Sequence, residues 1–125
     1  MNTPEEMETA VCQGIRCFEQ ESRGRFPTEV RAQLIRYLLF VRLHGVLTVA
    51  ELQLAKSPPA GRGRDLLKQV RCHLIETAKP LLQAMVQGIT GVPVVSLHHD
   101  ISTLSGEAVI LFTLVEAPFA TIKKR

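Results

Sequence analysis

The chain has 125 residues, of which 46% are hydrophobic and 22% are charged, and its formal net charge is +3. A chain of this length forms one domain around one core, and its apolar content excludes a disordered protein. Its longest apolar runs, such as residues 37–41, fall far short of the roughly 20 residues that a membrane helix needs. The acidic start MNTPEEMETA lacks the apolar stretch of a secretory signal. We therefore expect a cytoplasmic protein without direct membrane insertion, either free or peripheral to the inner membrane.

The first predicted element is a helix over residues 4–23. Its apolar residues recur in steps of three and four, which leaves the glutamates on the solvent side. Thr3 and Pro4 suit a helix start, and acidic residues follow them at the positive end of the helix dipole. Gly24 and Pro27 predict its end.

Residues 28–44 show the period of two that is typical of strands. The apolar members that share a face are Val30, Ala32, Leu34, Leu39, Val41 and Leu43. Two antiparallel strands with a turn near Arg36-Tyr37 are therefore predicted. Because that turn contains no Gly, Asn or Asp, a helix over residues 28–40 is an open alternative.

Two helices are predicted in the middle of the chain. Thr48 and Glu51 have the spacing of a capping box, which predicts a short helix over residues 48–56. The segment SPPAGRGR, residues 57–64, predicts a loop. Residues 65–89 carry the longest helical pattern, with Pro80 predicting a kink. The core-facing stripe predicted for this helix is Leu67, Val70, Leu74, Ala78, Leu81, Met85 and Ile89, and it is widened into a broad apolar face by Leu66, Ile75, Leu82 and Val86.

The last two predicted elements are strands at about 92–100 and 107–115, joined by a turn near Ser105-Gly106. The second of these strands is apolar on both faces. A strand with two apolar faces needs cover on both, and the chain is too short to supply a second sheet. We therefore expect a homodimer, whose interface candidates are Val109, Leu111, Thr113 and Val115.

Together these elements predict an α+β fold in the order α-β-β-α-α-β-β. The four strands form one antiparallel sheet in two hairpins, with the long helix on one face and a second copy of the chain on the other. Residues 1–117 make a single domain, and residues 118–125 are predicted to be a frayed basic tail.

Three histidine or acidic residues are candidates for a metal site. His98 and Asp100 share a strand face, and His44 could join them if the two strands were neighbours, giving two histidines and one carboxylate. The simpler interpretation is a solvated strand end. No catalytic motif or cofactor site is predicted.

The cysteines Cys12, Cys17 and Cys72 lack the Cys-x-x-Cys spacing of zinc and thioredoxin-like sites, so we expect free thiols in a reducing cytosol. Cys72 is predicted to be a buried small apolar residue of the long helix.

The strongest cationic feature is a set of four side chains at the start of the long helix: Arg62, Arg64, Lys68 and Arg71. Backbone N–H groups at a helix start attract anions, and arginines add bidentate bonds to phosphate or carboxylate. These residues are candidates for binding an anion or a partner, although the Gly61-x-Gly63 signal is weak and a solvated basic loop is the alternative. Nucleic-acid binding by base stacking is disfavoured because the chain has few aromatic residues.

From about residue 6 to residue 115 the chain resembles the small soluble component of the bacterial sodium-translocating membrane-potential-generating system. The motifs that carry the resemblance are Val41-Arg42-Leu43-x-Gly45-Val46-Leu47-Thr48, Ala55-Lys56, Lys68-Gln69-Val70-Arg71, Pro80-Leu81-Leu82, Thr90-Gly91-Val92 and Ser96-Leu97-His98-x-Asp100-Ile101-Ser102. The basic segment SPPAGRGR departs from the family pattern, being longer and more basic, which puts in doubt any partner contact made there.

The resemblance implies membrane partners: an antiporter-like protein related to proton pumps, and a large soluble protein of the kind seen in inorganic-carbon uptake. It assigns no catalytic residues. The leading interpretation is a non-enzymatic cytosolic homodimer, acting as an accessory or regulatory subunit of a membrane cation or bicarbonate translocation system. The alternatives are a nucleic-acid- or anion-binding regulator and, third, a metal enzyme using His98 and Asp100.

Overall fold

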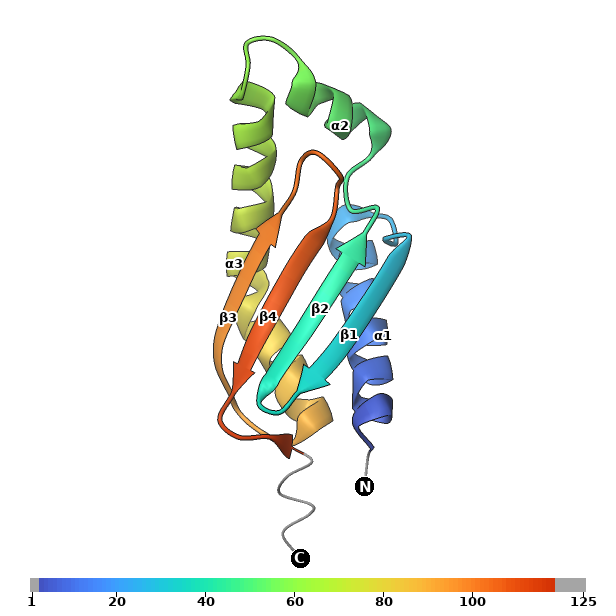
Figure 1. Cartoon of the computed structure of the whole chain (residues 1–125), viewed down its shortest axis with the longest axis vertical. Coiled ribbons are helices and arrows are strands. Elements are labelled where there is room, and N and C mark those ends of the chain that lie inside the picture. The colour runs from blue at the N-terminus through green and yellow to red at the C-terminus, as the bar shows by residue number, and fades with distance from the viewer. Residues whose placement is uncertain (1–2, 119–125) are drawn as a thin grey trace, which may run out of the picture.

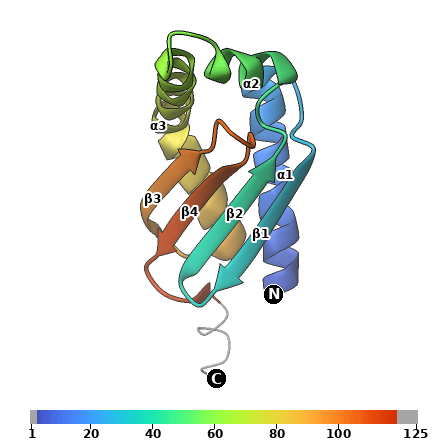
Figure 2. The same cartoon turned by 45° about the horizontal axis from the view of Figure 1, so that its top comes forward.

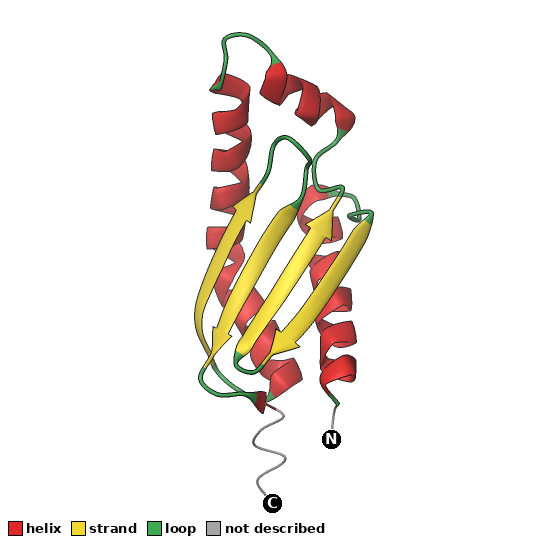
Figure 3. Cartoon of the chain, in the orientation of Figure 1, coloured by secondary structure: helices red, strands yellow, loops and turns green. Residues whose placement is uncertain are grey.

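A computed structural model describes residues 3–118 of the chain (Figure 1). Its elements are α1 (Pro4–Arg23), β1 (Glu29–Ile35), β2 (Leu38–His44), α2 (Val49–Lys56), α3 (Arg62–Thr90), β3 (Val94–Ile101) and β4 (Ala108–Leu114). The predicted α+β class and element order are confirmed (Figure 3). The predicted tail, residues 118–125, lies outside the described residues from 119 onward.

The four strands form one antiparallel sheet in the order β1-β2-β4-β3. The two hairpins are therefore joined through their second strands, with β2 and β4 at the centre and β1 and β3 at the edges. The alternative helix over residues 28–40 is wrong, because β1 pairs with β2 from Glu29–His44 to Ile35–Leu38. Arg36 makes the turn with a φ of +57°, a conformation that an arginine adopts at some cost.

Helices α1 and α3 both lie on the same face of this sheet, so the domain has two layers (Figures 1 and 2). The prediction placed the long helix on that face and did not place the first helix. The core lies between the layers and includes Val11 and Ile15 from α1, Ile75 and Val86 from α3, and Phe112 from β4. No helix within residues 3–118 covers the opposite face of the sheet.

Two capping boxes fix the starts of α1 and α2. In α2, the Thr48 hydroxyl accepts from the Glu51 backbone N–H, and the Glu51 carboxylate accepts from the Thr48 N–H. Thr3 and Glu6 make the same reciprocal pair at α1. The capping spacing predicted the α2 start correctly.

Helix α3 begins at Arg62, so the predicted loop over residues 57–64 is wrong in its last three residues. Gly61 caps the helix with a φ of +83°, and Gly63 is buried in its first turn. A Cβ on Gly63 would lie 2.1 Å from the backbone oxygen of Leu54 at the end of α2. Gly63 thus allows α2 and α3 to approach closely. The helix continues past Pro80 to its cap at Gly91.

The buried face of α3 agrees only in part with the broad apolar face predicted for it. Val70 and Leu81 are 66% and 63% exposed, whereas Arg71, Ile75 and Leu82 are buried. The prediction was correct for Ile75 and Leu82. It missed the burial of Arg71 because it followed apolar residues alone. Cys72, predicted to be buried, is exposed one residue beyond Arg71.

A buried ion pair joins the two helices. Glu19 of α1 is fully buried, and its carboxylate lies 2.8 Å from the guanidinium of Arg71, which is 6% exposed. Arg23 lies 3.5 Å from the same carboxylate, donates to the backbone oxygen of Val46 and lies 3.7 Å from Glu51. This network links α1 and α3 to the segment that leads from β2 into α2.

Removing the charge of Glu19 should destabilise the fold. In a Glu19→Gln variant, Arg71 remains buried without its carboxylate, and we expect a loss of roughly 3–5 kcal/mol in the free energy of unfolding. Chemical denaturation of the variant beside the wild type measures this loss. Glu21→Gln, on the exposed side of the same helix, is the matched control and should change stability by less than about 0.5 kcal/mol. An equal effect of both variants would contradict the proposed importance of the pair.

Candidate functional site

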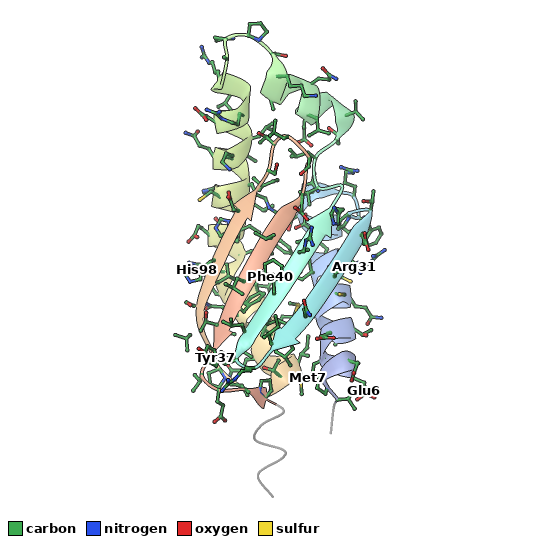
Figure 4. The ribbon with its side chains drawn as sticks, in the orientation of Figure 1. Glu6, Met7, Arg31, Tyr37, Phe40 and His98 are labelled. Carbon is green, nitrogen blue, oxygen red and sulfur yellow. The ribbon has the colours of Figure 1, made fainter. Side chains whose placement is uncertain are left out.

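The open face of the sheet carries apolar side chains across its two central strands. Phe40 on β2 lies opposite Leu111 on β4, and Leu38 lies opposite Thr113. These side chains are only half-buried within one copy of the chain, although they lie at the centre of the sheet. Ile35 extends the apolar region onto β1 and is 49% exposed. In Figure 4, which views this face, Phe40 lies between Arg31 and His98.

Charged residues border the apolar region at one end of the strands. Arg31 on β1 pairs with Glu29, 2.5 Å away, and lies opposite Arg42 on β2. Arg42 pairs with Glu107, whose carboxylate is also 3.5 Å from the His44 ring. The Arg31 guanidinium is the main reason that the pKa of Glu29 lies below its usual value. The open face is therefore apolar at its centre and charged at one end.

The predicted interface residues fall largely on this face. Val109, Leu111 and Thr113 alternate with the buried residues of β4, and all three are half-buried. Val115 follows the end of β4 and is 60% exposed. The structure adds residues that the prediction did not name, above all Phe40 and Leu38. The same alternation in residues 38–44 could have identified them.

The predicted cationic residues lie partly together. Arg64 and Lys68 line a hollow of about 330 Å³ with Lys56, between the start of α3 and the turn after β3. Lys68 donates to Asp100 at 3.0 Å and to the backbone oxygen of Ile101 at 2.9 Å. Arg64 pairs with Asp65 at 3.1 Å. Two of these cations therefore already have a carboxylate partner.

The other two predicted cations, Arg62 and Arg71, do not line this hollow. Arg71 is buried against Glu19, and within residues 3–118 no ion pair involves the exposed side chain of Arg62. Gly63 is explained by the close approach of α2, and Gly61 by its positive φ at the helix cap. Binding of an anion or a partner at Arg62, Arg64 and Lys68 stays a prediction.

The three candidate metal ligands of the sequence analysis are not brought together. β4 lies between β2 and β3, so the strand that carries His44 is not a neighbour of the strand that carries His98. His98 is exposed on the open face and lies 3.4 Å from the Ser96 hydroxyl, while Asp100 binds Lys68. Figure 4 shows His98 on β3, at the edge of the sheet.

These features define a small two-layer α+β domain with one uncovered, partly apolar sheet face. A family model described as Na+-translocating membrane potential-generating system (MpsC) matches residues 3–116. The chain is 32% identical over 108 residues to the uncharacterized protein YbcI of Bacillus subtilis (strain 168), covering 86% of this chain and 85% of that protein. No solved structure matches significantly.

The chain therefore belongs to the MpsC family of the Na+-translocating membrane potential-generating system. The resemblance inferred from the sequence motifs is confirmed. Within residues 3–118, none of the helices combines the length and the apolar character required to span a bilayer.

The contact between Lys68 and Asp100 predicts that the pKa of Asp100 changes when Lys68 is replaced. The Lys68 ammonium and then the Ile101 backbone N–H hold the pKa of Asp100 below its ordinary value of 3.8. A lowered carboxyl pKa contributes stability above the ordinary value, and this stability is lost as the pH falls through the lower folded-state value. In Lys68→Ala, we expect the Asp100 pKa to rise toward 3.8, as measured by NMR titration of the side-chain carboxyl. Lys56→Ala, which removes another cation of the same hollow, should leave it unchanged. An unchanged Asp100 pKa in Lys68→Ala would refute the link.

Proposed function

We propose that the chain is a non-enzymatic accessory or regulatory subunit, acting at the cytoplasmic side of a membrane cation or bicarbonate translocation system. Family membership supports a role within a membrane-potential-generating system. The observation that carries the proposal is the uncovered sheet face, whose centre is apolar around Phe40 and Leu111. Such a face is a surface for protein association.

The first occupant of this face is a second copy of the chain. The two copies would pack face to face, related by a two-fold axis that runs parallel to the strands, above the line between β2 and β4. This axis places β2 of one copy over β4 of the other, and β1 of one copy over β3 of the other. It places Phe40 of one copy against Leu111 of the other, because these residues lie opposite each other in the sheet. The contact is repeated by symmetry, as in an isologous dimer.

The same axis also brings charges of opposite sign together. Arg31 on β1 and Asp100 on β3 lie in one row across the sheet, since they pair with Arg42 and Val109 respectively, which pair with each other. Exchange of β1 and β3 places each Arg31 near the other copy's Asp100. The apolar centre of the face is thus complementary to itself. At the edges, Arg31 and Asp100 keep their partners Glu29 and Lys68 within each copy and gain a second opposite charge from the other copy.

A charge at the centre of this face should separate the dimer. In Leu111→Asp, an unpaired carboxylate lies where the two sheets meet, and we expect the dimer dissociation constant to rise at least roughly 30-fold. Sedimentation equilibrium at micromolar concentration measures this change. Val49→Asp is the control, because Val49 is 75% exposed and belongs to α2 rather than to the sheet. A wild-type chain that is monomeric at these concentrations would refute the dimer.

The membrane partners can be tested by affinity capture from crosslinked native cells. The tagged chain should enrich polytopic membrane subunits, and nuclease treatment should leave this enrichment unchanged because nucleic acid plays no part. Val49→Asp, the surface control used above, should enrich the same membrane subunits as the wild type. Recovery of nuclease-sensitive partners alone would overturn the proposal. It would favour the nucleic-acid- or anion-binding alternative, whose affinity must fall steeply with added salt.

A further inference from the structure

Three potential metal ligands meet where α3 packs along the edge strand β3. Cys72 and Glu76 lie on α3, and His99 lies on β3. One ligand atom from each residue, a thiol sulfur, a carboxylate oxygen and a ring nitrogen, lies within 4.8 Å of the other two. Within residues 3–118, no other group of three such residues comes together in this way. The cluster is separate from the open face and from the predicted set of His44, His98 and Asp100.

The local structure explains why these three side chains converge. Cys72 and Glu76 are four residues apart, so they project from the same side of the helix about one turn apart. Helical metal ligands in known motifs use the same spacing. His99 lies between Leu97 and Ile101, which are both buried under the helices, so its side chain points toward the helix layer.

Hydrogen bonds already hold the imidazole and the carboxylate in position. The His99 Nε2 atom lies 3.0 Å from Glu76 Oε2, and Lys79 Nζ lies 3.1 Å from the other carboxylate oxygen. The His99 side chain is only 12% exposed. Cys72 is exposed, and its sulfur lies within 4.8 Å of the ligand atoms of this pair.

We propose that Cys72, Glu76 and His99 bind a zinc ion. Thiolate, imidazole and carboxylate are the ligands of protein zinc sites, at about 2.0–2.3 Å from the metal. On binding, the Cys72 thiol releases its proton to solvent. The Nε2–H of His99, which donates to Glu76 in the metal-free state, also loses its proton, so that the ring keeps one proton on Nδ1 and the Nε2 lone pair replaces the hydrogen bond with a bond to the metal. The thiolate and the carboxylate balance the charge of the ion.

A fourth coordination position would face a small hollow. This hollow, of about 170 Å³, borders two of the ligands and is lined by Lys68, Arg71, Cys72, His99, Asp100 and Ile101. Its two cations are each paired, Lys68 with Asp100 at 3.0 Å and Arg71 with Glu19 at 2.8 Å. The positive charge beside the site is therefore compensated, and a tetrahedral ion has room for one water or one small ligand.

Zinc titration of the reduced, untagged chain tests this assignment. In competition with a chromophoric chelator, the wild type should bind one Zn²⁺ per chain. Cys72→Ser and Glu76→Gln should each weaken binding by at least about tenfold, since even changes around metal ligands have effects of this size. Cys17→Ser is the matched control, because it removes another exposed cysteine. It should bind zinc like the wild type.

Two further readouts separate coordination from a merely structural effect. Cobalt bound at the site should show a thiolate-to-metal absorption band, which Cys72→Ser abolishes and Cys17→Ser retains. Added zinc should raise the melting temperature of the wild type and of Cys17→Ser but not of Cys72→Ser, because binding to the folded state alone stabilises it. Substoichiometric zinc binding by the wild type, or a thiolate band that persists in Cys72→Ser, would overturn the proposal.

Discussion

The placement of α1 and α3 on one face of a single sheet determines what the rest of the molecule can bury. Helix packing covers the side of the sheet that carries Val41, Ile110 and Phe112, all of which are fully buried. The other side receives no cover from residues 3–118, although its centre is apolar. One layer of helices can bury only one side of a four-stranded sheet whose central strands are apolar on both sides. The open face is thus a consequence of the topology, and it is the basis of the proposed association.

The seam between the two helices is fixed by charge as well as by apolar contact. Ionised groups as buried as Glu19 and Arg71 lose much of their hydration, so each depends on the other. Arg23 extends the network to the backbone of Val46, where the chain leaves β2 for α2. The position of α2, and with it the basic hollow at the start of α3, is therefore coupled to the packing of α1 against α3.

Much of the fold could be predicted from the sequence because its local signals agree with one another. The alternation in residues 28–44 identified both strands, and the Thr48–Glu51 capping pair identified the start of α2. The turn at Arg36 could not be predicted from turn chemistry, because pairing along the whole of β1 and β2 outweighs one unfavourable backbone conformation. Residue type likewise suggested an anion-binding role for Gly61 and Gly63, whereas the structure shows a helix cap at Gly61 and a close helix contact at Gly63.

The candidate sites were harder to predict, since they depend on pairs of residues distant in the chain. An apolar pattern cannot show that Arg71 is buried, because its partner Glu19 lies on another helix. The apolar face expected for α3 therefore included Val70 and Leu81, which are exposed, and omitted Arg71. Cys72 was expected to be buried because free cysteine is usually a small apolar residue of the core. With the true orientation, Cys72 and Glu76 face β3 rather than the core.

The edge strand β3 connects the two proposed surfaces of the molecule. Its residues alternate, so that His98 and Asp100 belong to the open side while His99 points to the helix layer. An ion bound by His99 would link β3 to α3 on the helix side of the sheet. The opposite side of the same strand supplies Asp100 to the proposed dimer. Edge strands are otherwise the least constrained part of a sheet, because one side of their backbone is unpaired. A metal at this position would therefore make the edge of the association surface more rigid without taking part in the contact itself.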